Sequence, residues 1–78
     1  MQVEILSPEK KIFSGEADHV QFPGTAGSFG VLNNHAPIIS SLNKGVIKLR
    51  SGGNTTEFPI DGGFVEVLKN NVTVLVEG

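Results

Sequence analysis

The chain has 78 residues, six basic and eight acidic side chains, a formal net charge of −2 at pH 7, and no cysteine. Nucleic-acid binding needs an excess of Lys and Arg, so this charge balance argues against that class of protein. The lack of cysteine excludes disulfides and thiolate metal ligands. The longest apolar stretch, 72–76, is far shorter than the roughly 20 residues of a membrane-spanning helix, and the N-terminus shows no signal-peptide pattern.

The composition favours strands. Val, Ile and Thr together number nineteen, whereas Ala numbers only three, and ten Gly and four Pro interrupt the chain. Turn signals recur every eight to twelve residues. These features predict an all-β fold: a small antiparallel β-sandwich of two sheets, with about nine to ten short strands in a single domain over residues 1–78.

In the first half of the chain, strands are predicted over residues 2–6, 11–13, 17–22 and 29–32. Ser-Pro at 7–8, Ser-Gly at 14–15 and Pro-Gly at 23–24 are the turn signals that separate them. Val20 and Phe22 alternate with His19 and Gln21, which predicts that the first pair faces the core.

In the second half, strands are predicted over residues 38–42, 46–50, 55–60, 64–68 and 72–76, with loops rich in Gly and Asn between them. Pro59 has no N–H to donate to a neighbouring strand, so its strand is predicted at a sheet edge or at a bulge. The alternation predicts a core made of Val3, Ile5, Val20, Phe22, Phe29, Val31, Ile47, Leu49, Ile60, Val65 and Val74.

The residues alone predict no metal site. His19 and His35 lack neighbours at ligand spacing. The simplest interpretation is a surface residue for His19, and for His35 a turn residue whose ring caps local backbone groups. Gly24, Gly27 and Gly30 do not form a dinucleotide fingerprint, because no helix follows them, and they are interpreted as turn positions with positive φ.

The spacing of the residues in the sequence supports no catalytic site either. Ser40, His35 and Asp18 could be imagined as nucleophile, base and orienting group, and Glu16 with Asp18 as an acid–base pair. Lys44 lies at a turn, as the lysine of a lipoyl-type carrier does, but lacks acidic flanks. From the residues alone the interpretation is a small β module that binds another protein.

A series of motifs carries a resemblance to a known family. They are Phe13-Ser14-Gly15, the run 22–32 (FPGTAGSFGVL), the run 34–37 (NHAP), the run 42–49 (LNKGVIKL) and the run 61–67 (DGGFVEV). In this order, from about residue 3 to residue 76, they resemble the N-terminal β-sandwich of the epsilon subunit of rotary ATP synthases.

The resemblance implies a non-catalytic central-stalk (rotor) subunit of a rotary proton-translocating ATP synthase. Such a subunit links gamma to the polar loops of the c-ring and transmits torque for ATP synthesis, at the cytoplasmic face of the bacterial inner membrane. No catalytic residue, cofactor, metal, small-molecule substrate, nucleic acid or direct membrane insertion is implied.

The resemblance also assigns residues to the two partners. Ser7, His35 and Ser40 match positions that face gamma. The loop Gly24, Thr25, Ala26, Gly27 and Ser28 matches the loop that faces the c-ring, although the family often has an acidic residue where Ser28 stands.

Most members of the family continue with a two-helix C-terminal domain that inhibits ATP hydrolysis. The sequence ends at Gly78, so a short form without this inhibition is expected. The alternatives are a stand-alone β-sandwich that binds a ligand or protein and, less favoured, a minimal enzyme.

Overall fold

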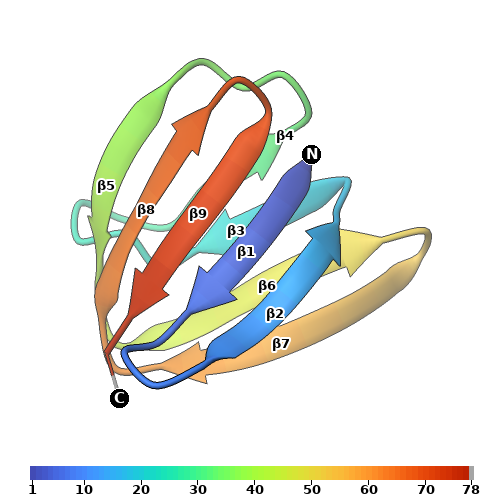
Figure 1. Cartoon of the computed structure of the whole chain (residues 1–78). Coiled ribbons are helices and arrows are strands. Elements are labelled where there is room, and N and C mark those ends of the chain that lie inside the picture. The colour runs from blue at the N-terminus through green and yellow to red at the C-terminus, as the bar shows by residue number, and fades with distance from the viewer. Residues whose placement is uncertain (78) are drawn as a thin grey trace.

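The structure, a computed structural model, describes residues 1–77, none of which is helical. Its nine strands are β1 (Gln2–Leu6), β2 (Lys11–Glu16), β3 (His19–Phe22), β4 (Phe29–Leu32), β5 (Ile38–Leu42), β6 (Gly45–Ser51), β7 (Asn54–Ile60), β8 (Gly63–Leu68) and β9 (Asn71–Val76). A five-stranded sheet has the order β2-β1-β9-β8-β5, and a four-stranded sheet packed behind it has the order β4-β3-β6-β7 (Figure 1). The predicted all-β sandwich is confirmed. No helix in the described part is long and apolar enough to cross a membrane.

One pair of strands departs from the predicted antiparallel pattern. β1 and β9 run parallel, with Val3 opposite Val72 and Ile5 opposite Val74. A parallel pair needs a long connection, and here the two strands lie at opposite ends of the sequence. Local turn signals report only neighbouring strands, so they give no indication of this pairing.

Two strand boundaries differ from the prediction by more than one residue. β2 continues through Ser14, which pairs with Glu4, and Gly15, which pairs with Val3. β3 begins at His19 and not at residue 17, because the chain changes sheets there. The Ala17 N–H donates to the carbonyl of Met1 in the first sheet (2.9 Å), and the Asp18 N–H donates to that of Arg50 in the second (2.8 Å).

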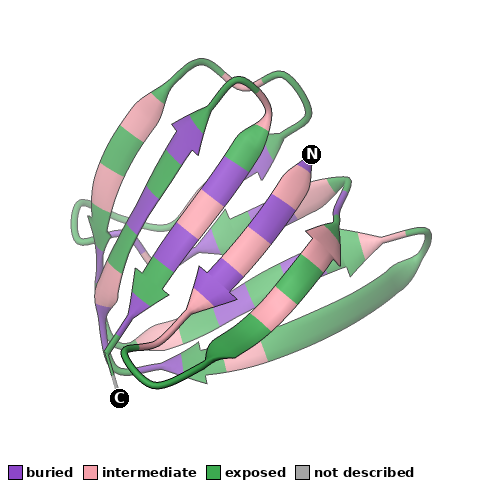
Figure 2. Ribbon diagram, viewed as in Figure 1, coloured by how far each residue is buried: buried purple, intermediate pink, exposed green. Residues whose placement is uncertain are grey.

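The core lies between the two sheets. Ten of the eleven predicted core residues are buried; Phe29 is only half-buried, with its ring centroid 5.5 Å from that of the fully buried Phe22. Pro59 lies in β7, at the edge of the four-stranded sheet, as predicted. Figure 2 shows buried and solvent-facing residues alternating along β1, β8 and β9.

Candidate functional site

The outer face of the five-stranded sheet carries exposed apolar side chains. We call Ile39, Phe64, Leu68 and Leu75 the apolar patch; they are 74%, 52%, 47% and 46% exposed. The register brings them together, since Phe64 lies opposite Leu75 across β8 and β9, and Ile39 lies opposite Glu66 across β5 and β8. Clusters of large exposed apolar side chains mark sites where another surface docks.

The alternation of β8 explains how the patch forms. Val65 and Val67 point into the core, so Phe64, Glu66 and Leu68 point to solvent. A strand that is apolar on both faces is typical of a sheet that is covered on both sides. That signal is present in the sequence, in the apolar runs 38–39, 64–65 and 74–76, although the patch itself was not predicted.

Two hollows lie on this face. One, of about 370 Å³, is lined by Pro37, Ile38, Ile39, Glu66, Val67 and Leu68. The other, of about 170 Å³, is lined by Ile39, Phe64, Glu66, Thr73 and Leu75. Ile39 and Glu66 line both, so the two hollows adjoin at this pair of neighbouring side chains.

The three residues predicted to face gamma lie around this sheet but do not touch one another. Ser7 follows β1, and its hydroxyl is hydrogen-bonded within its own turn to Lys10. Ser40 lies in the edge strand β5, paired with Val65, and is half-buried on the core side. The row Leu6–Leu75–Phe64–Ser41 crosses the sheet between these two positions. It spans three strand spacings, or about 14 Å.

His35 lies in the loop between β4 and β5, two residues before Pro37. The ring is half-buried, and Nδ1 is 2.6 Å from the carbonyl oxygen of Ala36. The prediction that this ring caps local backbone is therefore confirmed. The loop is also held by the side-chain oxygen of Asn70, which accepts from the Asn34 N–H at 2.8 Å.

The predicted c-ring loop, residues 24–28, joins β3 to β4 and is tied to the end of β5. The Thr25 N–H donates to the Ser41 carbonyl at 3.1 Å, and the hydroxyls of Thr25 and Ser41 lie 3.2 Å apart. Thr25, Ala26, Gly27 and Ser28 are exposed. Ser41 follows Ser40 in β5, so the Thr25 end of this loop lies next to one of the positions predicted to face gamma.

The glycines of this region do not all serve as positive-φ turns. Gly27 does, with φ of 125°. A Cβ on Gly24 would lie 2.6 Å from the Gly27 carbonyl oxygen, and one on Gly30 would lie 2.7 Å from Nε2 of His19. The contact at Gly24 is with backbone and excludes a Cβ, whereas the contact at Gly30 is with the end of the His19 side chain. Neither glycine has a positive φ, so the turn interpretation was wrong for both.

The imagined catalytic set is not assembled. The Ser40 hydroxyl donates to the Ser41 carbonyl, and Oδ2 of Asp18 accepts from the Gly52 N–H at 3.0 Å. His35 uses its ring within its own turn. Across residues 1–77 no three His, Asp or Glu side chains are grouped as metal ligands would be.

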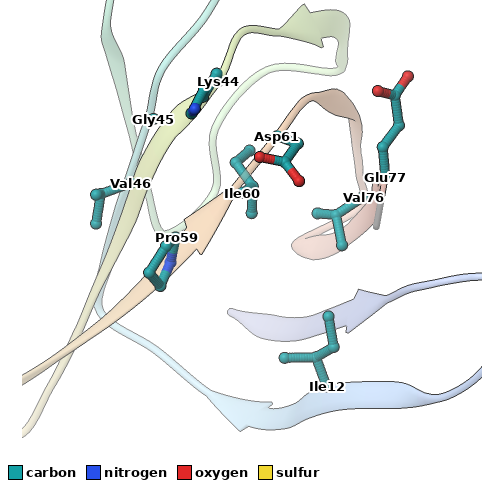
Figure 3. Close-up of a pocket in the computed structure, with 9 residues that line it drawn as sticks. All are labelled: Ile12, Lys44, Gly45, Val46, Pro59, Ile60, Asp61, Val76 and Glu77. Carbon is teal, nitrogen blue, oxygen red and sulfur yellow. The ribbon is translucent and has the colours of Figure 1, made fainter.

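A third hollow, of about 470 Å³, opens at the end of the sandwich near the C-terminus (Figure 3). Its lining comes from β2, β6, β7 and β9, with apolar side chains from Ile12, Ile60 and Val76 and charged ones from Lys44, Asp61 and Glu77. Lys44 borders this hollow and connects β5 to β6. These two strands belong to different sheets, so Lys44 is not at the tip of a hairpin, as the lysine of a lipoyl-type carrier is.

The chain is similar to known proteins of one family. Residues 1–78 match the family described as ATP synthase, Delta/Epsilon chain, beta-sandwich domain. The ATP synthase epsilon chain of Caulobacter vibrioides is 43% identical over 77 residues, which cover 99% of this chain and 90% of that one. The epsilon chain of Leptospira borgpetersenii is 40% identical, but this chain spans only 61% of its length.

Solved structures share the fold. The Tetrahymena thermophila mitochondrial ATP synthase, central stalk and c-ring, contains a chain with a TM-score of 0.84 at 19% identity, covering 99% of this chain and 63% of that chain. The Euglena gracilis mitochondrial ATP synthase contains one with a TM-score of 0.89 at 22% identity, covering 95% and 48%. With the family match over the whole chain, the conclusion is that this chain belongs to the ATP synthase delta/epsilon family through its β-sandwich domain.

Proposed function

We propose that this chain is a non-catalytic subunit of the central stalk of a rotary proton-translocating ATP synthase. It joins the gamma subunit to the polar loops of the c-ring and carries torque between them. Membership of the family and the naming of relatives as epsilon chains support this role. The complex then holds the chain at the cytoplasmic face of the bacterial inner membrane.

The observation that carries the proposal is the apolar patch on the outer face of the five-stranded sheet. The patch offers a rigid, regular surface, and its four side chains are between 46% and 74% exposed in the isolated chain. Covering them with a partner removes apolar area from water, which favours a lasting contact. A rotor joint needs both stiffness and such a contact.

The assignment of partners to surfaces follows the predicted positions. Gamma covers the apolar patch and reaches Ser7 and His35 beside it, and Ser40 at the open edge of β5. The exposed loop 24–28 meets the c-ring, where small side chains at Ala26 and Gly27 allow close approach of backbone groups.

Co-purification with the gamma subunit tests the proposal. The wild-type chain is expected to retain gamma, and Ile39→Asp to lose it. Val46→Asp is the matched control, because Val46 is an exposed apolar residue (38%) on the four-stranded sheet. Failure of the wild-type chain to retain gamma contradicts the proposal.

A further inference from the structure

We infer that Glu66 pairs with a basic side chain of the partner that covers the apolar patch, and that this pair sets the specificity of docking. The inference rests on the function proposed above, because it concerns the same surface. It adds the chemistry that the partner must present: a Lys or Arg flanked on both sides by apolar side chains.

Glu66 lies inside the patch and not at its rim. Along β8 it lies between Phe64 and Leu68, and across the strands it lies between Ile39 and Thr73. Leu75 is the next outward residue after Thr73 on β9. A partner that buries these apolar side chains therefore also removes the Glu66 carboxylate from water.

The carboxylate has no counter-charge of its own. Within residues 1–77, Glu66 takes part in neither an ion pair nor a side-chain hydrogen bond. Glu4 lies in the same outward row, one residue beyond Thr73, and is paired with Lys11 at 3.2 Å. Burying an unpaired carboxylate is strongly unfavourable, so a partner that lacks a cation at this point is rejected.

The two hollows define the rest of the partner's surface. Because Ile39 and Glu66 line both, a basic side chain that reaches Glu66 is flanked by apolar groups entering each hollow. Apolar contacts around a charged pair exclude water from it, as the contacts around an interface hot spot do, and some close charge pairs then favour binding.

Charge argues against two other occupants. A two-fold pairing of this chain centred on the patch would bring two Glu66 carboxylates together, and like charges at an interface are unfavourable. An anionic membrane surface would face Glu66 without supplying a fixed cation. A protein partner with a Lys or Arg fits both the apolar and the charged features.

Titration calorimetry of the full chain with purified gamma subunit tests the inference, using Glu66→Gln, which keeps the shape and removes the charge. We expect roughly thirtyfold or more loss of affinity. Glu4→Gln is the matched control and is expected to stay within about threefold, because an exposed pair contributes little. The melting temperatures of both variants report whether the fold is retained.

The outcomes separate the inference from the proposed function. If Glu66→Gln binds gamma as tightly as the wild type while Ile39→Asp abolishes binding, the patch docks gamma but the charge inference is wrong. If the wild-type chain does not bind gamma, the proposed function fails and the inference fails with it. A dimer in sedimentation that Ile39→Asp dissolves would assign the patch to a second copy and overturn the inference.

Discussion

Phe64 and Leu75 lie directly opposite each other on β8 and β9, and both point to solvent, 52% and 46% exposed. Their immediate neighbours along the chain, Val65 and Val74, form the next pair and are fully buried. The same two strands therefore contribute to the core with one face and carry the exposed apolar patch on the other. Changes to each face have different expected consequences.

The core face is tested by Phe22→Ala. Phe22 is fully buried and packs against Phe29 with ring centroids 5.5 Å apart. Removing the ring leaves a cavity in a thin core, so the free energy of unfolding is expected to fall by about 3–5 kcal/mol. Urea denaturation followed by circular dichroism measures it. A loss below about 1 kcal/mol would mean that the ring is not a central part of the core.

The first residue of β8 is tested by Gly63→Ala. Gly63 has φ of 141°, and a Cβ there would lie 2.0 Å from the Leu75 carbonyl oxygen. The substitution is expected to destabilise the chain by at least about 2 kcal/mol. Gly52→Ala is the control: its φ of 57° is also positive, but no atom lies within 4 Å of the added Cβ. That variant is expected to lose about 1 kcal/mol, and equal losses in the two denaturation curves would refute the role given to the contact with Leu75.

His35→Glu is expected to weaken gamma binding by roughly fivefold or more while leaving the melting temperature nearly unchanged. The ring makes its hydrogen bond within its own turn, so the fold does not depend on a distant contact of this side chain. The added carboxylate, however, lies two residues from Pro37, which lines the larger hollow of the patch. Calorimetry with gamma measures the effect, and unchanged affinity would remove His35 from the proposed contact.

Ala26→Trp tests the loop proposed to face the c-ring. Ala26 is exposed, so the fold and gamma binding are expected to survive the larger side chain. Assembly on membranes that contain the c-ring is expected to fail, because the indole prevents close approach of the loop. Thr55→Trp, on the exposed edge strand β7, is the matched control and should assemble normally. A loss of gamma binding in Ala26→Trp equal to that in His35→Glu would contradict the separation of the two surfaces.

Local chemistry made most of the strands predictable from the sequence. The alternation of Val20 and Phe22 with polar neighbours identified the buried face of β3, and Pro59 identified an edge strand. The parallel pairing of β1 with β9 was not predictable in this way, because it joins residues about 70 positions apart and depends on closure of the whole sheet.

The apolar patch was harder to predict than the core. Ile39 and Leu75 have apolar neighbours in sequence, so a reading of each strand alone assigns them no separate role. Their place in one patch with Phe64 becomes clear only when the register of β5, β8 and β9 is known. The positions Ser7, His35 and Ser40 came from resemblance, and their contact with gamma remains a prediction.

The central claim is that gamma covers the apolar patch, on the β5, β8 and β9 side of the outer face of the five-stranded sheet. The most direct measurement replaces Phe64, in the patch, with the photo-crosslinking residue p-benzoylphenylalanine, and in a second variant replaces Glu57 on the outer face of the four-stranded sheet. After irradiation with gamma present, the account predicts a crosslink from position 64 and none from position 57. A crosslink to gamma from position 57 and none from position 64 would contradict it.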